Sequence, residues 1–192
     1  MISDHYIYRM KKYLMLLLLL PAISFAQNNT VQPGTIDYLD FKKGFKRIVL
    51  GAELSDIAND VKEISKENAN VRPGVSEYLV TNSELLAVGE SIRIDKIYIS
   101  TFRNRIATIS FIMKEPNGDL LLKTFIEAYG TPSKPNRYID SYLWRGKVVA
   151  AFVNVDKSTN QLGQSAAIFD LRMQDEIDAY GRKEAKKAIE GI

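Results

Sequence analysis

The 192-residue chain contains no cysteine and only one histidine, His5, which lies in a segment that we expect to be removed. The Ser-His-Asp and Cys-His nucleophile systems both need an imidazole base. The usual zinc sites take their ligands mainly from cysteine and histidine. The sequence therefore argues against the commonest hydrolases and zinc enzymes, and we expect no cofactor, no metal site and no disulfide. Carboxylate chemistry, Ser-Lys chemistry and oxygen-ligated calcium remain open.

The apolar run Tyr13–Leu20 is too short to span a bilayer, which takes about 20 residues. Lys11-Lys12 precede this run, and the small residues of Ser24-Phe25-Ala26 follow it. A basic start, a short apolar stretch and small residues at a cleavage site are the parts of a secretory signal peptide. We therefore interpret residues 1–26 as a signal peptide and expect a periplasmic or secreted protein. Gln27 stands where a lipid-carrying cysteine would have to be, so we expect no lipoprotein anchor.

The chain carries a formal net charge of only +3 at pH 7, and part of that charge lies in the signal segment. That segment contains three basic residues, Arg9, Lys11 and Lys12, and one acidic residue, Asp4. The net charge of residues 27–192 is therefore close to zero. Recognition of nucleic acid depends on a strongly basic face. We expect no nucleic-acid partner, and no stable membrane insertion once the signal is cleaved.

The remaining sequence has the length of one domain. Residues 27–40 are polar and contain Pro33-Gly34, which predicts a flexible lead-in. Residues 41–192 then form one α+β domain, with possible sub-units 41–115 and 116–192. Each sub-unit has an expected helix followed by about three antiparallel strands. This order favours an antiparallel sheet with helices packed on one face.

Two helices are expected from capping and periodicity. Ser55 is positioned to cap a helix over residues 56–66. A second helix over residues 120–129 ends at Gly130, with Pro132 two residues beyond. A weaker helical pattern runs from Gln174 to the end. The expected strands cover residues 41–51, 77–82, 91–102 with a bulge near 95–96, 105–114, 138–144, 147–155 and 165–172.

Three details of the strands follow from residue type. Arg103-Asn104 predicts a tight hairpin, because asparagine tolerates positive φ. Ala107, Ile109, Phe111 and Met113 alternate and are expected on one face. Residues 148–153 are apolar on both faces, which predicts a central strand covered twice.

Short segments of this chain resemble small exported α+β proteins. Gly44–Gly51 followed by Leu54–Ile57 is similar to the opening of the β-lactamase-inhibitor-protein-like fold and of related outer-membrane assembly lipoproteins. Tyr129–Pro132, followed by a strand ending in Trp144–Gly146, looks like the second half of such a unit. The signal segment is similar to those of exported Bacteroidetes proteins. The resemblance covers Phe41–Arg172, and it implies a non-catalytic role in binding or inhibiting another protein, or in envelope assembly. The missing lipid-carrying cysteine departs from the assembly lipoproteins.

The candidate binding site is an aromatic group on the expected strand 138–144. Tyr138, Tyr142 and Trp144 share parity, so they are predicted to project from one face. Arg137 and Arg145 flank them, and aromatic and arginine side chains are enriched at interface hot spots. The alternative is that Tyr142 and Trp144 cover the sheet beneath a helix, with the tyrosine hydroxyl at the rim.

These observations favour a soluble, non-enzymatic binding module with a protein partner in the cell envelope. Its predicted binding residues are Tyr138, Tyr142, Trp144 and Arg145. The alternatives are a carboxylate-based glycan hydrolase and a structural envelope component.

Three further groups carry possible chemistry, and each has an ordinary interpretation that we favour. A glycosidase needs two carboxylates across the scissile bond, but twenty-three acidic residues make such pairs by chance. A calcium loop needs denser acidic ligands than one expected hairpin offers. Basic residues near the end alternate with glutamates, which favours a solvated face over a lipid contact. These groups are Asp37, Asp40 and Glu53; Asp156, Asn160 and Gln161; and Arg182, Lys183, Lys186 and Lys187.

Overall fold

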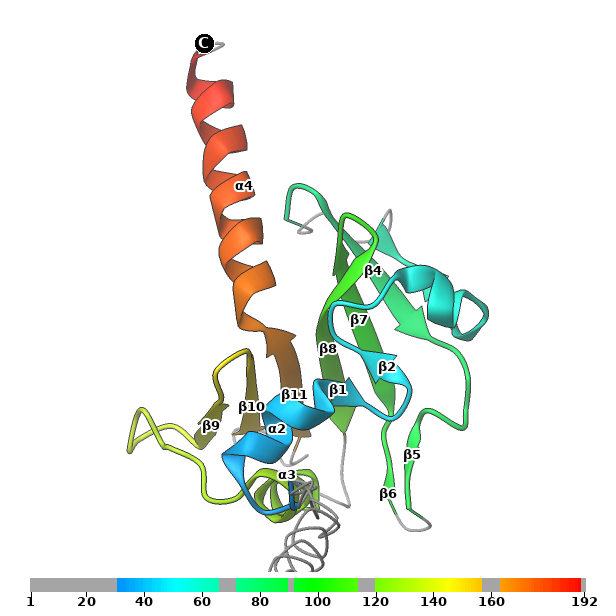
Figure 1. The fold of residues 1–192 in the computed structure, drawn as a ribbon, viewed down its shortest axis with the longest axis vertical. Coiled ribbons are helices and arrows are strands. Elements are labelled where there is room, and N and C mark those ends of the chain that lie inside the picture. Colours follow the sequence, from blue (N-terminus) through cyan, green and yellow to red (C-terminus); the bar gives the residue numbers. More distant parts are fainter. Residues whose placement is uncertain (1–30, 66–71, 90–91, 114–119, 157–162, 191–192) are drawn as a thin grey trace, which may run out of the picture. The chain divides into compact units, whose positions relative to one another are not determined.

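The central feature is a seven-stranded antiparallel sheet in the order β3-β4-β7-β8-β11-β10-β9 (Figure 1). The computed structural model describes residues 31–65, 72–89, 92–113, 120–156 and 163–190. The α+β class and the antiparallel sheet are confirmed. The strands are β3 (Val61–Glu63), β4 (Val75–Val80), β7 (Lys96–Phe102), β8 (Arg105–Met113), β9 (Ser141–Arg145), β10 (Val149–Asp156) and β11 (Gly163–Asp170).

Two meanders make up this sheet, and they meet where β8 pairs with β11. Strands β3, β4, β7 and β8 follow one another on one side, and β9, β10 and β11 follow one another on the other. Ile109 lies opposite Ile168 across the junction, and Phe111 lies opposite Ala166. Directly opposed residues project from the same face of an antiparallel pair. The junction therefore carries the apolar face continuously from one meander to the other.

The hairpin between β7 and β8 is confirmed. Arg103 and Asn104 have φ values of 52° and 62°, which is the left-handed pair that a two-residue hairpin turn requires. The register shift falls between Ser100 and Thr101 rather than near residues 95–96. As a result Ala107 packs with a different cluster from Ile109, so the expected common face of these two residues is wrong.

The expected long strand 91–102 is two strands. Its beginning, β6 (Ile92–Arg93), pairs with β5 (Ala87–Val88) in a small separate sheet. Only β7 joins the large sheet. Ile94 is buried at the break between the two, and its backbone N–H donates to the Leu86 carbonyl at 2.7 Å.

The helix expected over residues 56–66 is wrong. The chain forms a short 3₁₀ segment, η1 (Leu54–Asp60), and then turns into β3. Ile57 breaks the helical path with φ −130°, and Val61 pairs with Val80 of β4. Ser55 makes no cap, because the residue before the segment is Glu53. Pairing with a neighbouring strand outweighed the local helical spacing of these β-branched residues.

The expected lead-in contains a helix. Residues Ile36–Lys42 form α2, and its Leu39 is fully buried. The strand expected over residues 41–51 is instead the tight pair β1 (Gly44–Phe45) and β2 (Ile48–Val49). A Cβ on Gly44 would lie 2.1 Å from the Ile48 carbonyl oxygen, so this turn needs glycine.

Helix α3 (Leu120–Tyr129) has the bounds expected from its periodicity and from Gly130. Gly130 adopts φ 79° and its N–H donates to the Ile126 carbonyl at 2.8 Å, as a helix-ending glycine does. Phe125 packs against Phe111 of the sheet and against Trp144, with ring centroids 6.1 and 5.7 Å apart. Helices α2 and α3 therefore cover the same face of the sheet (Figure 1).

Helix α4 (Leu171–Glu190) packs on the opposite face. Met173 and Ile177 are buried against Phe102 and Ala107, and the Tyr180 ring lies 5.8 Å from that of Phe102. On the rest of this second face Ala150 and Ala167 are buried, whereas Phe152 and Phe169 are half-buried. Strand β10 lies next to the edge strand rather than at the centre, and Phe152 on its second face is only half-buried. The prediction that this strand lies at the centre of the sheet is therefore wrong, and on its second face Ala150 is buried while Phe152 is half-buried.

One carboxylate joins distant parts of this architecture. Asp40 of α2 accepts hydrogen bonds from the backbone N–H groups of Lys147, Val148 and Val149, at 2.7, 3.0 and 3.0 Å. A Cβ added to Gly146 would lie 2.4 Å from the Asp40 carboxylate, so the turn leaves room for it. The interaction fixes α2 against the turn between β9 and β10.

We expect Asp40→Ala to lower the free energy of unfolding by about 2 kcal/mol, because three amides lose a charged acceptor. Urea denaturation measures this. Asp37→Ala is the matched control on the same helix, since Asp37 is exposed, and its effect should stay within about 0.5 kcal/mol. Equal effects of the two substitutions would contradict the proposed role of Asp40.

Gln164 is the one described side chain whose buried polar atoms have no hydrogen-bond partner. It lies on the helix-covered face of β11, opposite Met113 and Val155, and is 2% exposed. An unpaired buried amide costs free energy that an apolar side chain of the same size would not. This position therefore weakens the fold.

Gln164→Met should raise the free energy of unfolding by about 1 kcal/mol, because it removes an unpaired amide at nearly constant volume. Thermal or urea unfolding checks it. Gln174→Met is the control, since the Gln174 amide bonds Thr108 and Arg72 at 2.9 and 3.0 Å. That variant should be destabilised. A destabilised Gln164→Met variant would mean that the amide has a partner in solution.

Candidate functional site

The predicted aromatic group is split by the fold. Strand β9 begins only at Ser141, so Tyr138 lies in the preceding loop and not on the strand. Trp144 and Tyr142 oppose Ala151 and Val153 of β10, whereas Arg145 opposes Ala150 on the other face. The expectation that these aromatic residues share one strand face is therefore wrong for Tyr138.

Trp144 belongs to the core. Its side chain is 2% exposed, its indole N–H donates to the Gly130 carbonyl at 2.7 Å, and its ring packs on Phe125. This is the alternative interpretation, in which the tryptophan covers the sheet beneath a helix. A partner has no access to Trp144 in this conformation, so its expected place on a binding surface is wrong.

Tyr138 is the most exposed of the large apolar or aromatic side chains in the described ranges, at 80%. Ile139 beside it is 56% exposed. The Arg137 guanidinium lies 4.6 Å from the Tyr138 ring centroid and also donates to the tyrosine hydroxyl. We refer to residues 131–140, which carry these side chains, as the Tyr138 loop.

The base of the Tyr138 loop is held on both sides. Ser133 and Leu143 exchange backbone hydrogen bonds of 2.8 and 2.9 Å. Lys134 forms an ion pair with Asp140 at 2.9 Å, and its ammonium lies 5.5 Å from the half-buried Tyr142 ring. These contacts order the base of the loop while its tip stays in solvent.

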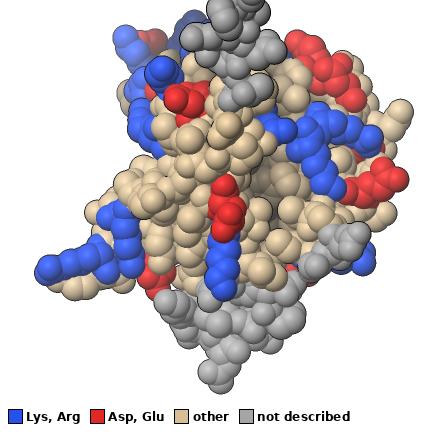
Figure 2. Space-filling model, turned by 60° about the horizontal axis from the view of Figure 1, so that its bottom comes forward, with Lys and Arg blue, Asp and Glu red and all other residues tan. Residues whose placement is uncertain are grey.

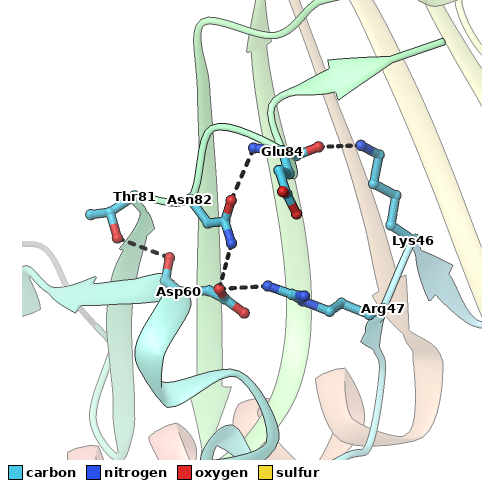
Figure 3. A network of polar contacts seen from close by, with 6 residues as sticks. All are labelled: Lys46, Arg47, Asp60, Thr81, Asn82 and Glu84. Atoms are coloured by element: carbon cyan, nitrogen blue, oxygen red, sulfur yellow. Dashed lines mark hydrogen bonds and ion pairs between the residues drawn. The ribbon is translucent and has the colours of Figure 1, made fainter.

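A second polar group surrounds Asp60 at the end of η1 (Figure 3). The buried Asp60 carboxylate accepts from Arg47 at 2.6 Å and from the Asn82 amide at 2.8 Å. Its backbone carbonyl accepts from the Thr81 N–H at 2.7 Å and from the Thr81 hydroxyl at 3.1 Å.

This group continues toward the turn that follows β4. The Asn82 side-chain oxygen accepts from the Glu84 N–H at 2.9 Å, and Lys46 donates to the Glu84 carbonyl. All these bonds tie η1, the turn after β4 and the β1–β2 turn together (Figure 3). The arrangement is structural, because the Asp60 carboxylate is already paired and buried.

Of the three acidic residues that glycan chemistry would draw on, Asp40 has its carboxylate held by three backbone amides, whereas Asp37 and Glu53 are exposed. The backbone of Glu53 pairs with that of Arg105. Within the described ranges no group of three or more acidic or histidine residues is placed to hold a metal ion. The loop with Asn160 and Gln161 lies outside the described residues.

Tyr129 lies at the end of α3 and is buried. Burial, and secondarily the nearby Tyr38, raises the pKa of Tyr129 to about 12. Its hydroxyl therefore stays neutral at physiological pH. This shift follows from packing under α2, where the Tyr38 and Tyr129 ring centroids are 6.4 Å apart.

The surface shows no concentration of one charge on the face seen in Figure 2. Lysine and arginine side chains alternate with acidic ones around a largely uncharged area. Among the helices of the described ranges, none has the length and apolar character needed to cross a membrane.

Comparisons with protein-family models, with curated proteins and with solved structures found no match.

The Asp60 group has a predicted pH signature. Hydrogen bonds from Asn82 and then Arg47 hold the Asp60 pKa below its usual value of 3.8. A group with a lowered folded-state pKa stabilises the fold above its unfolded pKa, and this contribution is lost as pH falls through the folded value. Wild-type protein should therefore lose more stability than Asp60→Asn between about pH 5 and about pH 2.

Urea midpoints measured across that pH range test this expectation. Asn82→Ala removes the largest cause of the shift and should flatten the profile in part. Parallel profiles for wild type and Asp60→Asn would show that Asp60 is not the group responsible.

Proposed function

We propose that this chain is an exported, non-enzymatic binding module that contacts a protein partner in the cell envelope through the Tyr138 loop. The observation that carries the proposal is the exposure of Tyr138, which is 80% exposed and lies beside Arg137. An ion pair between Lys134 and Asp140 orders the base of the loop that carries both residues. Tyrosine and arginine are, with tryptophan, the residue types enriched at binding hot spots. An exposed ring on an ordered base loses little conformational entropy when it is buried by a partner.

The neighbouring residues extend this surface. Ile139 adds exposed apolar area, and Lys134 with Tyr142 forms the base of the loop. An apolar centre with a polar rim is the usual composition of a protein–protein interface. Arg145 projects from the other face of β9 and is left out of this surface.

The proposal that the chain is exported is based on residues 1–26, which contain a lysine pair, a short apolar run and small residues before Gln27. The resemblance to exported inhibitor-like and assembly proteins also favours a protein partner. The commonest catalytic side chains are absent after that segment, which favours binding over catalysis.

Tyr138→Ala should weaken capture of the partner from envelope extract by about thirtyfold, the usual effect of losing an aromatic hot spot. Its stability should be unchanged, because the side chain is exposed. Quantitative pull-down with the purified chain as bait, followed by titration of the recovered partner, makes the measurement.

Phe41→Ala is the matched control, since Phe41 is an exposed aromatic residue that belongs to α2 and not to the Tyr138 loop. Trp144→Ala is unsuitable because it removes a core side chain. Equal affinity of wild type and Tyr138→Ala for every recovered partner would refute the assignment of this loop.

A further inference from the structure

The tip of the Tyr138 loop presents three exposed polar side chains in a row, those of Asn136, Arg137 and Tyr138. Each of them can donate hydrogen bonds, and an arginine side chain is a donor only. In Figure 1 the loop projects at the left of the view, beyond the edge strand β9. These side chains are therefore open to a partner that approaches the loop.

The acceptors of Asn136 are used within the loop. Its side-chain oxygen accepts from the Tyr138 backbone N–H at 2.9 Å, and its backbone carbonyl accepts from the Ile139 N–H at 3.4 Å. Since a backbone N–H needs an oxygen acceptor, the half of the amide that is left over is the NH2 group. In the described part of the chain that NH2 group donates to no other residue. Asn136 therefore offers a partner mainly its donor hydrogens.

The Tyr138 hydroxyl is also left as a donor. Arg137 donates to its oxygen, and the guanidinium lies 4.6 Å from the ring centroid. A hydroxyl that accepts from arginine still has its own O–H to donate. A guanidinium carries five N–H donors, so a bond to Tyr138 leaves most of them for a partner. The two residues therefore hold a cation and a hydroxyl next to each other, and both donate.

The tip carries a positive charge that no acidic residue of the described ranges pairs with. Asp140 is the one acidic residue of the Tyr138 loop, and its carboxylate forms an ion pair with Lys134 at 2.9 Å. Arg137 takes part in none of the ion pairs among the described residues. A partner of negative charge is therefore the one that complements this tip.

We propose that the Tyr138 loop recognises a carboxylate of its protein partner, on an acidic side chain that lies next to an apolar one. The inference rests on the proposed function, because it names the chemistry that the loop binds. An ionised carboxylate only accepts hydrogen bonds, and its two oxygens match the fork of the Arg137 guanidinium. The Tyr138 hydroxyl and the Asn136 NH2 group supply further donors for its remaining lone pairs.

The apolar neighbour in the partner follows from Ile139 and from the Tyr138 ring. Ile139 is 56% exposed and lies next to Tyr138 in the chain. The Arg137 guanidinium lies over one face of the Tyr138 ring, which leaves the other face for an apolar side chain. Stacking also restrains the guanidinium, so less conformational entropy is lost when it binds a carboxylate.

A phosphate group fits the tip less well. Phosphate-binding sites usually gather several arginine or lysine side chains. The tip has one arginine, and the lysine of the loop, Lys134, is paired with Asp140. A carboxylate carries a single negative charge, which one arginine balances.

Selection of random displayed peptides on the purified full chain, recovered after export, tests the inference. We expect the selected peptides to be enriched in aspartate or glutamate beside an apolar residue. Selection on Arg137→Glu should reverse this preference to lysine or arginine, because the charge at the tip changes sign. Circular dichroism establishes that the variant is folded, as expected for an exposed position.

Peptide affinities, measured by fluorescence anisotropy, make the test quantitative. The probe is one selected peptide, synthesised with either glutamate or glutamine at the selected acidic position. Wild-type chain should bind the glutamate form about tenfold more tightly, because a hydrogen bond to a charged group contributes more than one to a neutral amide. Arg137→Gln should abolish this preference. Added salt should reduce it, as for any exposed ion pair.

Two further variants serve as a matched test and a control. Asn136→Asp keeps the oxygen that accepts from the Tyr138 N–H and replaces the NH2 donor by a carboxylate oxygen, so it should also remove the preference for glutamate. Arg145→Gln is the control, since Arg145 is an exposed arginine on the other face of β9. It should leave the tenfold preference unchanged.

The outcomes separate this inference from the proposed function. Peptides whose binding Tyr138→Ala weakens, but which show no acidic preference, would overturn the carboxylate and leave the loop as a binding site. A selection that yields no peptide weakened by Tyr138→Ala would contradict both. Vesicles of anionic phospholipid that bind wild type but not Arg137→Gln, with no acidic peptide selected, would assign the tip to phosphate and overturn the inference.

Discussion

The pairing of β8 with β11 is the interaction on which the rest of this structure depends. Helix α3 packs on both meanders, since Phe125 contacts Phe111 of β8 and Trp144 of β9. Across the junction Phe111 lies opposite Ala166, and this large–small pair leaves room for Phe45 and Phe125 to pack on the Phe111 ring, at 5.1 and 6.1 Å. Helix α3, whose Phe125 makes that contact, is thereby fixed over the centre of the sheet.

The two faces of the sheet are covered by different numbers of elements, so they differ in how much apolar surface they bury. One face is buried under α2, α3, η1 and the small sheets, while among the described elements the first half of α4 is what packs on the other. Along each strand the residues of the second face alternate with core residues. A sheet face that is only partly covered can carry polar as well as apolar side chains. Small and hydroxyl side chains predominate between β10 and β7, with Phe152 and Tyr98 at the margins.

Two carboxylates show how acidic side chains are used in this fold. Asp40 accepts three backbone amides, and Asp60 accepts an arginine and an asparagine. Each satisfies backbone or side-chain donors at a junction between elements that are far apart in the chain. Paired carboxylates of this kind stabilise the arrangement of the elements that they join, and neither of these two is a free base. The Tyr138 loop is exposed because it lies beyond the edge strand β9.

Local signals were sufficient for part of the fold. The sequence predicts α3, its end at Gly130 and the Arg103-Asn104 hairpin correctly, because capping, periodicity and turn preference act within a few residues. Strand β8 was also expected within one residue of its observed end, since its alternation is long and regular.

Tertiary structure decided the elements whose local preference was weak or misleading. Residues 56–66 have helical spacing but pair as β3, and Asp40 finds its amides more than a hundred residues away. Tyr138, Tyr142 and Trp144 have the same parity in the sequence, yet one is exposed, one half-buried and one in the core. By itself the sequence determined the α+β class, the short elements with strong ends and the absence of thiol and imidazole chemistry beyond residue 26. Strand pairing and burial depend on partners distant in the chain, so only the folded molecule decided which aromatic side chain meets solvent.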